Sequence, residues 1–491
     1  MNRYPVNLVW FKRDLRIRDH LPLKKASESA LPTVLLYIYE PELVGDAHYD
    51  DRHWRFVWES LEELNQQLSP NHKVCIAFGD VEKVFEELNR EYTIKTVFSH
   101  EETGILTTYQ RDIRMAAWFK SRAITWDESP TNAVYRGLFT RKHWKPQWKS
   151  RILSEPDQPD LKALTTVKLS ESLTEKLLDY PIPNAWKTPA DRFQKGGEVQ
   201  ALQTLESFMG ERAASYMQAI SKPELSRTFC SRLSPYITWG NISIKQVHLA
   251  YRAWYPGSAF KWNLRSFESR LHWHCHFVQK FEAEYRMEFE NVNRGYDNLR
   301  TTINPVWVHA WKTGNTGYPL VDACMRAVQE TGYLNFRMRS MVVSFLTHHL
   351  WQPWQAGAVF LGRQFLDFEP GIHYPQFQMQ AGTTGTNTIR IYNPVKQSYE
   401  QDPKGIFIKT WVPELTEVPS SFIHEPWNMS LMEQQMYNCE LGEHYPSPIV
   451  DVKQTYRFAS DQLWAKKNDP GVKEEAKRIK RVHIKPGRRE A

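Results

Sequence analysis

Short apolar segments alternate with amphipathic helical segments over the first 130 residues. The apolar segments cover residues 7–11, 34–39, 74–78 and 96–99. Each has the length and composition typical of a buried parallel strand. Apolar spacing of three and four predicts helices between and after them, near residues 52–68, 81–92 and 107–122. This alternation predicts a doubly wound α/β domain over residues 1–130.

The pattern changes after residue 130. Residues 131–196 are rich in Pro, Lys and Ser and show little periodicity, which predicts a connector that crosses the surface. Beyond Gly197 the spacing is almost entirely helical, so residues 197–491 are predicted to form a larger all-α domain. The clearest helix covers residues 263–289. Its predicted core stripe is Phe267, Leu271, Val278, Phe281 and Tyr285, and a neighbouring face carries Arg270, Trp273, His274 and Phe277.

Composition changes this picture only slightly. The 491 residues are enough for two or three domains. A net charge of +7 favours a polyanionic partner weakly, because clustering of charge matters more than its sum. The chain is rich in aromatic residues, with 19 Trp, 22 Tyr and 24 Phe. Most of these residues are expected in the core, so only a few could stack on bases or carry electrons. The last stretch, residues 466–489, is basic and predicts a solvated tail, with nucleic-acid contact as the alternative.

Cysteine and histidine usage excludes several classes of site. The five cysteines are scattered without a CxxC pair, which argues against a disulfide framework and for a reducing compartment. In the run from His272 to His276, His272 and His276 share a helical face that His274 and Cys275 do not, so we expect no metal there. Neither a leader nor a membrane-spanning run is evident, so a cytoplasmic protein with no membrane association is expected.

The most specific stretch runs from Trp311 to Arg326 and continues from Gly332 to Arg339. It reads WKTGNTGYPLVDACMR and then GYLNFRMR, placing a glycine turn, a proline, a buried-looking Asp and arginines on successive short helices. It resembles the flavin-binding core of the DNA photolyase/cryptochrome family, whose WxxGxTGYPxVDAxMR signature it follows. The opening VWFKRDLRIRDH resembles the N-terminal antenna domain of that family, with His20 in place of the usual Asn. The resemblance spans nearly the whole chain, although four cysteines of the iron–sulfur branch are not evident.

The resemblance implies FAD in the helical domain and a set of residues that hold it. Cys230–Pro235 resembles the TSRLSP loop that binds the FAD pyrophosphate, with Cys230 replacing a threonine. Arg339 and Asp367 match a buried pair beside the isoalloxazine that would stabilise negative charge on the flavin. The full implied set is Tyr216, Ser231, Leu233, Ser234, Phe267, His274, Arg339, Asp367, Glu369 and His373.

Departures from the family pattern concern the chemistry. His373 stands where photolyases have the asparagine that contacts flavin N5; it could donate a proton or change charge near pH 6–7, or be a loop histidine away from the flavin. Arg270 replaces a glutamate that bonds the thymine dimer, and Phe336 replaces a lesion-contacting asparagine. Met379 replaces one tryptophan wall of the lesion pocket, whereas Trp273 preserves the opposite wall.

Two accessory features are also altered. The tryptophans that usually carry electrons to the flavin match Phe377, Trp354 and Thr301, so only Trp354 remains and the usual route is expected to be broken. Glu101 and Glu102 follow a predicted strand where family members bind an antenna chromophore of folate, deazaflavin or flavin type. A solvated pair at a helix start explains them equally well.

The sequence therefore supports three functions. The first is light-driven repair of pyrimidine photoproducts, with damaged DNA as the partner and a flipped-out lesion in the groove. The second is a cryptochrome-like photoreceptor that signals through flavin redox state to a protein partner; Arg270, Met379, Phe336 and Phe377 favour it, and the absence of a long C-terminal extension disfavours it. The third is a flavin-binding protein without a light function. Oligomeric state and signalling partner stay open.

Overall fold

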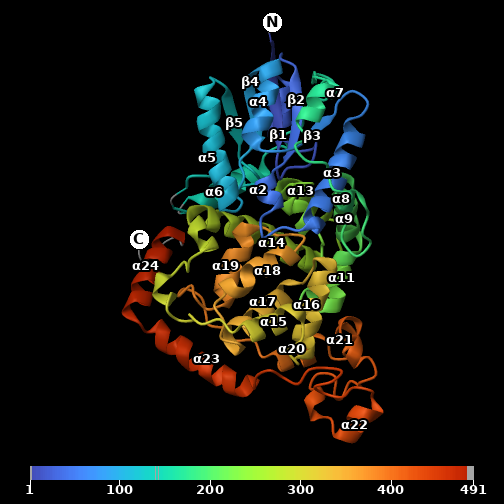
Figure 1. Cartoon of the computed structure of the whole chain (residues 1–491), viewed down its shortest axis with the longest axis vertical. Coiled ribbons are helices and arrows are strands. Elements are labelled where there is room, and N and C mark those ends of the chain that lie inside the picture. The colour runs from blue at the N-terminus through green and yellow to red at the C-terminus, as the bar shows by residue number, and fades with distance from the viewer. Residues whose placement is uncertain (1–2, 139, 142, 484–491) are drawn as a thin grey trace.

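The computed structural model describes residues 3–138, 140–141 and 143–483. An α/β domain that contains the N-terminus lies at one end, and a larger helical domain lies at the other (Figure 1). Both parts of the predicted architecture, a doubly wound α/β unit followed by an all-α unit, are confirmed.

The α/β domain is built on one parallel five-stranded sheet of order β3-β2-β1-β4-β5. The strands are β1 (Tyr4–Phe11), β2 (Thr33–Tyr39), β3 (Val74–Phe78), β4 (Tyr92–His100) and β5 (Thr125–Ser129). The first four contain the predicted apolar segments. β5 was not predicted, because its sequence TWDES is short and polar and only its last residue is buried. The strand order reverses between β1 and β4, so the carboxyl ends of these two strands frame the crevice where such sheets bind ligands.

The helices of this domain cover both faces of the sheet. They are α1 (Leu21–Ser27), α2 (Pro41–Val44), α3 (Asp51–Leu68), α4 (Val81–Glu91) and α5 (Leu106–Ser121). The three predicted helices are confirmed as α3, α4 and α5, with ends within one residue of the expected positions.

The segment predicted as an irregular connector contains three helices. These are α6 (Trp144–Leu153), α7 (Glu171–Lys176) and α8 (Asn184–Lys187). Trp144 and Trp148 of α6 are buried, and both rings pack against His272 of the helical domain. The prediction that the segment only crosses the surface was therefore wrong for α6. The apolar residues of α6 are four apart, as in a helix, but the Lys and Pro residues around them hid this spacing.

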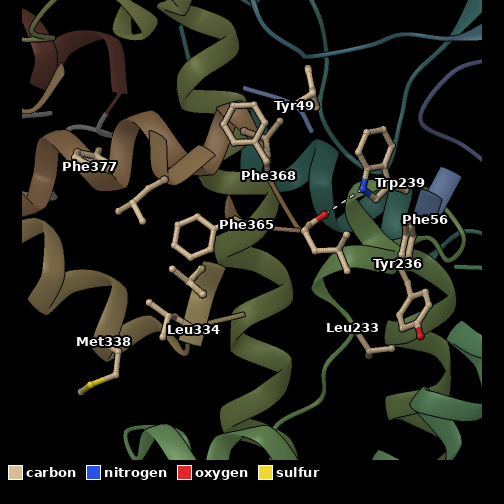
Figure 2. Packing of buried hydrophobic residues seen from close by; sticks show 14 of the residues in the cluster. Tyr49, Phe56, Leu233, Tyr236, Trp239, Leu334, Met338, Phe365, Phe368 and Phe377 are labelled. Atoms are coloured by element: carbon tan, nitrogen blue, oxygen red, sulfur yellow. Dashed lines mark hydrogen bonds between the residues drawn. The ribbon is translucent and has the colours of Figure 1, made fainter. Parts of the chain in front are cut away.

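The helical domain consists mainly of short helices around one apolar cluster. The α-helices are α9 (Glu198–Gly210), α10 (Tyr216–Ala219), α11 (Pro223–Phe229), α12 (Ser234–Thr238), α13 (Ile244–Trp254), α14 (Lys261–Ala283), α15 (Pro305–Thr313), α16 (Pro319–Thr331), α17 (Phe336–Ser344), α18 (Gln355–Gln364), α19 (Pro370–Gln380), α20 (Pro394–Gln401), α21 (Ile406–Trp411), α22 (Leu431–Met436), α23 (Val452–Lys467) and α24 (Pro470–His483). Figure 2 shows part of the cluster, in which Trp239 Nε1 donates a hydrogen bond of 3.1 Å to the Leu366 carbonyl.

The long helix α14 is the centre of this domain. Its predicted stripe is buried up to Phe281, but Tyr285 is 49% exposed, because α14 ends at Ala283 and a 3₁₀ turn follows. α14 packs closely along α19 at Gly371, where a Cβ would come within 2.8 Å of the Val278 Cα. This close approach places the apolar stripe of α14 against α19, which carries His373 and begins directly after Glu369.

The glycine signature folds as a pair of capped helices. Gly314 ends α15 and Gly332 ends α16, both at positive φ, which glycine adopts without a Cβ penalty. The signature's buried carboxylate, Asp322, accepts hydrogen bonds from the Thr316 N–H and hydroxyl at 2.8 and 2.6 Å, and from the Tyr445 hydroxyl at 2.5 Å. Asp322 therefore stabilises the turn itself.

The C-terminal segment is ordered as far as it is described. α23 and α24 run along one side of the helical domain (Figure 1). α24 buries Val472 and Ile479, and its Arg478 and His483 pair with Glu284 at 2.5 and 2.6 Å. The prediction of a solvated tail was therefore wrong up to residue 483, and the rest of that tail lies outside the described residues. No helix in the described part of the chain is both long and apolar enough to cross a membrane.

Candidate functional site

A loop before α12 presents a row of unpaired donors. Arg212 donates to the carbonyls of Cys230 and Ser231 at 2.5 and 3.3 Å, which turns these carbonyls toward its guanidinium. Arg232 has φ of +60°. Within the described residues, the N–H groups of positions 231–234 and the hydroxyls of Ser231 and Ser234 have no hydrogen-bond partner. Successive free N–H groups at a turn form a concave site for an anion such as a pyrophosphate.

An arginine–carboxylate pair lies where α17 faces the segment between α18 and α19. Arg339 Nη2 is 2.8 and 2.9 Å from the two carboxylate oxygens of Asp367, and its Nε donates to the Leu334 carbonyl at 2.8 Å. The guanidinium stacks 3.9 Å above the Phe365 ring. Asp367 is nearly buried, but the Arg339 side chain keeps 26% of its surface exposed, and no described residue accepts a hydrogen bond from Nη1. One donor of a fixed guanidinium thus stays available to a ligand.

His373 lies on α19, among aromatic rings. Its Nε2 donates to the Ala358 carbonyl at 2.8 Å, and its ring centroid is 5.3 Å from Phe368 and 5.1 Å from Phe377. Burial lowers the pKa of His373 to about 3, although the Ala358 carbonyl opposes this shift. The ring is therefore neutral at physiological pH, with Nδ1 as an acceptor. The expected change of charge near pH 6–7 does not occur at such a pKa.

Glu369 and His274 lie between this region and the α/β domain. Glu369 is 3.1 Å from Arg13, and burial raises the pKa of Glu369 despite this partner. His274 has no hydrogen-bond partner at Nδ1 within the described part of the chain. Burial, together with Arg13, lowers the pKa of His274 to about 4. Tyr216 is buried at the edge of this region, with its ring 6.0 Å from Phe267.

Comparisons with known proteins agree with this arrangement. A family model described as DNA photolyase matches residues 7–139, and another described as FAD binding domain of DNA photolyase matches residues 267–465. The chain is 27% identical over 470 residues to a deoxyribodipyrimidine photo-lyase of Alkalihalophilus pseudofirmus, covering 92% of this chain and 96% of that protein. It is 28% identical over 475 residues to a cryptochrome DASH of Gloeobacter violaceus, covering 91% and 93%. The chain belongs to the DNA photolyase/cryptochrome family.

Solved structures show the same fold over nearly the full length. A class III photolyase from Agrobacterium tumefaciens superposes with a TM-score of 0.81 at 26% identity, covering 96% of this chain and 99% of that chain. An archaeal photolyase from Sulfolobus tokodaii, solved with two FAD molecules, gives a TM-score of 0.76 at 24% identity, covering 94% and 100%.

FAD is the cofactor of this domain, and the residues present fit it. The unpaired N–H and hydroxyl groups of the 231–234 loop suit a pyrophosphate, and the free Arg339 Nη1 suits an electron-rich ring edge. No described side chain competes for these donors.

Charged side chains of the protein fill the crevice at the carboxyl ends of β1 and β4, where the strand order reverses. Arg111 is buried and pairs with Glu102 at 2.6 Å, with Asp112 at 2.9 Å and also with Glu40. Burial raises the pKa of Glu40 to about 7. Glu102 is therefore committed to Arg111, which contradicts the expectation of a solvated pair. Glu101 and Glu102 line a cavity of about 50 Å³ between the domains, together with His274 and Glu369.

The two expected wall positions differ in exposure. Trp273 on α14 is 45% exposed, and its ring lies 5.8 Å from the ring of Phe277 and 5.0 Å from that of His276, both on the same helix. Arg270, one turn before it, is exposed, and among the described residues its side chain donates hydrogen bonds only to Ser269. Met379 is half-buried on α19.

The expected electron-transfer residue is well buried. Trp354 is 2% exposed, and its Nε1 donates to the Asn291 side chain at 2.9 Å. Its ring is 6.5 Å from Phe377 and 6.0 Å from Tyr374. Thr301 is exposed. Tyr374 was not predicted as a functional residue, because a tyrosine in a buried helix carries no sequence signal of its own.

Histidines cluster at two places. His276 accepts a hydrogen bond of 2.7 Å from Arg141, and with His272 it packs against α6. Elsewhere, Asp14 Oδ2 lies 3.0 Å from His20 Nε2 and 2.7 Å from His100 Nδ1. His20, the departure from the family Asn, therefore anchors the start of α1 to the end of β1. Within the described residues, each cluster keeps one buried histidine nitrogen without a hydrogen-bond partner, His272 Nε2 in the first and His20 Nε2 in the second.

The buried histidines predict acid sensitivity of the folded state. Because His274 and His373 resist protonation when folded but titrate near 6.5 when unfolded, the unfolded chain binds more protons below pH 6.5. Stability is then complete above pH 6.5 and falls as the pH drops toward 4, by about 1.4 kcal/mol per pH unit for each histidine. Urea unfolding of FAD-free protein between pH 7.5 and 5 measures this slope. His373→Asn should reduce this slope by the contribution of one histidine, about 1.4 kcal/mol per pH unit. An unchanged slope would contradict the lowered pKa of His373.

Proposed function

We propose that the protein is a light-driven DNA repair flavoprotein that acts on pyrimidine photoproducts. Reduced FAD, when bound, supplies the electron that splits the lesion, and the electron returns to the flavin afterwards. The residues of this chain bind the cofactor, bind the lesion and exclude water. Damaged DNA is the proposed partner.

The exposure of Trp273 carries this proposal. A tryptophan ring left 45% exposed beside Arg270, which has no carboxylate partner in the described part of the chain, is suited to stack on a base while the guanidinium binds a phosphate or carbonyl. Met379 would form the opposite, thioether wall of the pocket. His373 would accept a hydrogen bond from the flavin through Nδ1.

The proposed FAD contacts follow the free groups described above. The 231–234 loop would bind the pyrophosphate, and Arg339, held by Asp367, would face the flavin edge. Glu369 would bind near the ribose, and Trp354 would serve electron transfer. The remaining proposed contacts are Tyr216, Phe267, Leu233 and His274. We also propose that residues 1–130 and 197–491 form the two domains and that residues 131–196 connect them. An antenna chromophore at the end of the sheet would require the side chains of Glu101 and Glu102 to move.

A photoreceptor of cryptochrome type is the second candidate. Phe377 and Phe336 replace residues that serve photoreduction and lesion contact in repair enzymes, and Phe336 is 51% exposed. Such a surface could instead receive a signalling protein. The observation that favours repair is that Arg270 has no carboxylate partner within the described part of the chain.

DNA binding separates the two candidates. Purified holoprotein is titrated with duplexes that carry a cyclobutane dimer, a (6-4) product or no lesion, at several salt concentrations. A repair enzyme prefers a damaged duplex, and its affinity falls with salt as phosphate contacts are screened. Equal and weak binding to all three duplexes would contradict the repair proposal and favour the photoreceptor.

A further inference from the structure

Tyr374 is the first member of a buried hydrogen-bonded triad that joins the two domains. Its hydroxyl is hydrogen-bonded to His48 Nε2, and His48 Nδ1 is 2.6 Å from the Asp46 carboxylate. Asp46 also accepts the His48 backbone N–H at 2.9 Å. Tyr374 is on α19, whereas Asp46 and His48 are in the loop after α2. Tyr374 is 1% exposed, so its hydroxyl has no access to bulk water.

The order of these groups determines which way a proton can move. Asp46 fixes the His48 tautomer with the proton on Nδ1, so Nε2 is the base that accepts the Tyr374 hydroxyl proton. Hydrogen bonds from His48 keep the pKa of Asp46 below its usual range, although burial opposes this. Burial raises the pKa of Tyr374, with Glu288 and Asp46 adding to the shift. The phenol therefore does not ionise on its own, but it has a base in contact.

A phenol with a base in contact is suited to one-electron oxidation. Loss of an electron makes a phenol strongly acidic, so a buried tyrosine can be oxidised readily only if its proton has somewhere to go. A histidine backed by a carboxylate receives that proton and stays paired. A tyrosine whose hydrogen bond to a histidine is purely structural needs no carboxylate behind that histidine.

Tyr374 also lies where the family's first tryptophan is missing. Phe377, one turn later on α19, cannot be oxidised readily. The Tyr374 ring is 5.4 Å from His373, which we place beside the flavin, and 6.0 Å from Trp354. It is thus an oxidisable ring between the proposed flavin position and the one remaining tryptophan.

We propose that Tyr374 donates an electron to photoexcited oxidised FAD with transfer of its proton to His48. One electron leaves the Tyr374 ring for the flavin, and the O–H bond breaks as a new N–H bond forms at His48 Nε2. The products on the protein are a neutral tyrosyl radical and an imidazolium paired with Asp46. Return of the electron from the flavin, or an added thiol, restores the tyrosine. The inference rests on the flavin position given under Proposed function.

Other titratable groups around the triad do not replace His48. Glu288, whose pKa burial raises to about 7, accepts the Leu106 N–H at 2.8 Å and is not hydrogen-bonded to Tyr374 in the described structure. Tyr49 is buried nearby and, as a phenol of raised pKa, offers no base. Asp46 keeps 19% of its side-chain surface exposed, which gives the triad one contact with solvent.

Trapped-radical spectroscopy tests the proposal. Holoprotein with oxidised FAD and no DNA is illuminated with blue light, frozen and examined by electron paramagnetic resonance, with transient absorption in H₂O and D₂O. We expect a tyrosyl signal that Tyr374→Phe abolishes and His48→Gln strongly reduces, and slower formation in D₂O. Tyr39→Phe is the matched control, because Tyr39 is equally buried but its hydroxyl has no partner in the described structure. FAD absorbance of each variant shows that the site is intact.

Two results would overturn the proposal. One is a tyrosyl signal that persists in Tyr374→Phe. The other is a wild-type signal that is purely tryptophanyl and disappears in Trp354→Phe. Repair by chemically reduced protein needs no such donor, so Tyr374→Phe should still repair under those conditions. Failure of the reduced wild-type protein to repair would count against the proposed function alone.

Discussion

Asp367→Asn should yield a protein that is purified largely without FAD. The substitution keeps the shape of the side chain but removes the negative charge that Arg339 contacts at 2.8 and 2.9 Å. Breaking a buried pair by removing one partner costs about 3–5 kcal/mol. Because Arg339 is partly exposed, we expect the lower end, roughly a hundredfold loss of FAD affinity. Absorbance of the purified variant and FAD titration of the stripped protein measure this loss.

A second ion pair in the same domain gives a matched control. Arg326 Nη1 lies 2.8 Å from both carboxylate oxygens of Glu414, and its other hydrogen bonds go to Gly314 and Asn315, neither of them a proposed cofactor contact. Glu414→Gln therefore removes a comparable contact without touching the flavin site, and it should retain FAD. Equal FAD loss in the two variants would mean that general destabilisation, rather than the Arg339–Asp367 pair, explains the result.

Trp273→Ala should abolish most of the preference for damaged DNA. Stacking of a base on an aromatic side chain contributes about 1–3 kcal/mol, so the loss in affinity for a lesion duplex is roughly 5- to 150-fold. The salt dependence should stay nearly the same, because Trp273 carries no charge. Arg270→Ala should instead weaken binding of all duplexes, damaged and undamaged, and make the affinity less dependent on salt.

Trp262 supplies the control for that variant. It is also on α14 and is 75% exposed, but it lies three turns before Trp273. Trp262→Ala should bind damaged DNA as the wild type does. A loss of affinity in Trp262→Ala as large as that in Trp273→Ala would contradict the assignment of Trp273 to the lesion pocket.

Local patterns were sufficient for much of the fold. Apolar runs located β1 to β4, because strands buried on both faces leave an unbroken apolar signal. Helical spacing located α3, α4 and α5 within one residue. The glycines of the signature located the turns, since Gly314 and Gly332 both adopt positive φ. β5 and α6 were missed because polar residues dominate both segments.

The site was harder to predict, because its contacts join distant parts of the chain. Arg339 and Asp367 were paired only through the family resemblance, and the free donors of the 231–234 loop follow from the way Arg212 holds the carbonyls. Tyr374 and His48 are 326 residues apart, and no local pattern links them. The charge of His373 also depends on its burial, which the sequence does not report.

Repair by protein whose flavin has been chemically reduced is the decisive test of the repair proposal. Prior reduction makes the result independent of Tyr374 and Trp354. Oligonucleotides with a cyclobutane dimer or a (6-4) product are illuminated with blue light, with dark samples as the control, and the products are separated by chromatography. We expect light-dependent loss of one lesion with recovery of intact pyrimidines. No loss of either lesion, with FAD demonstrably bound and reduced, would contradict repair and favour a photoreceptor.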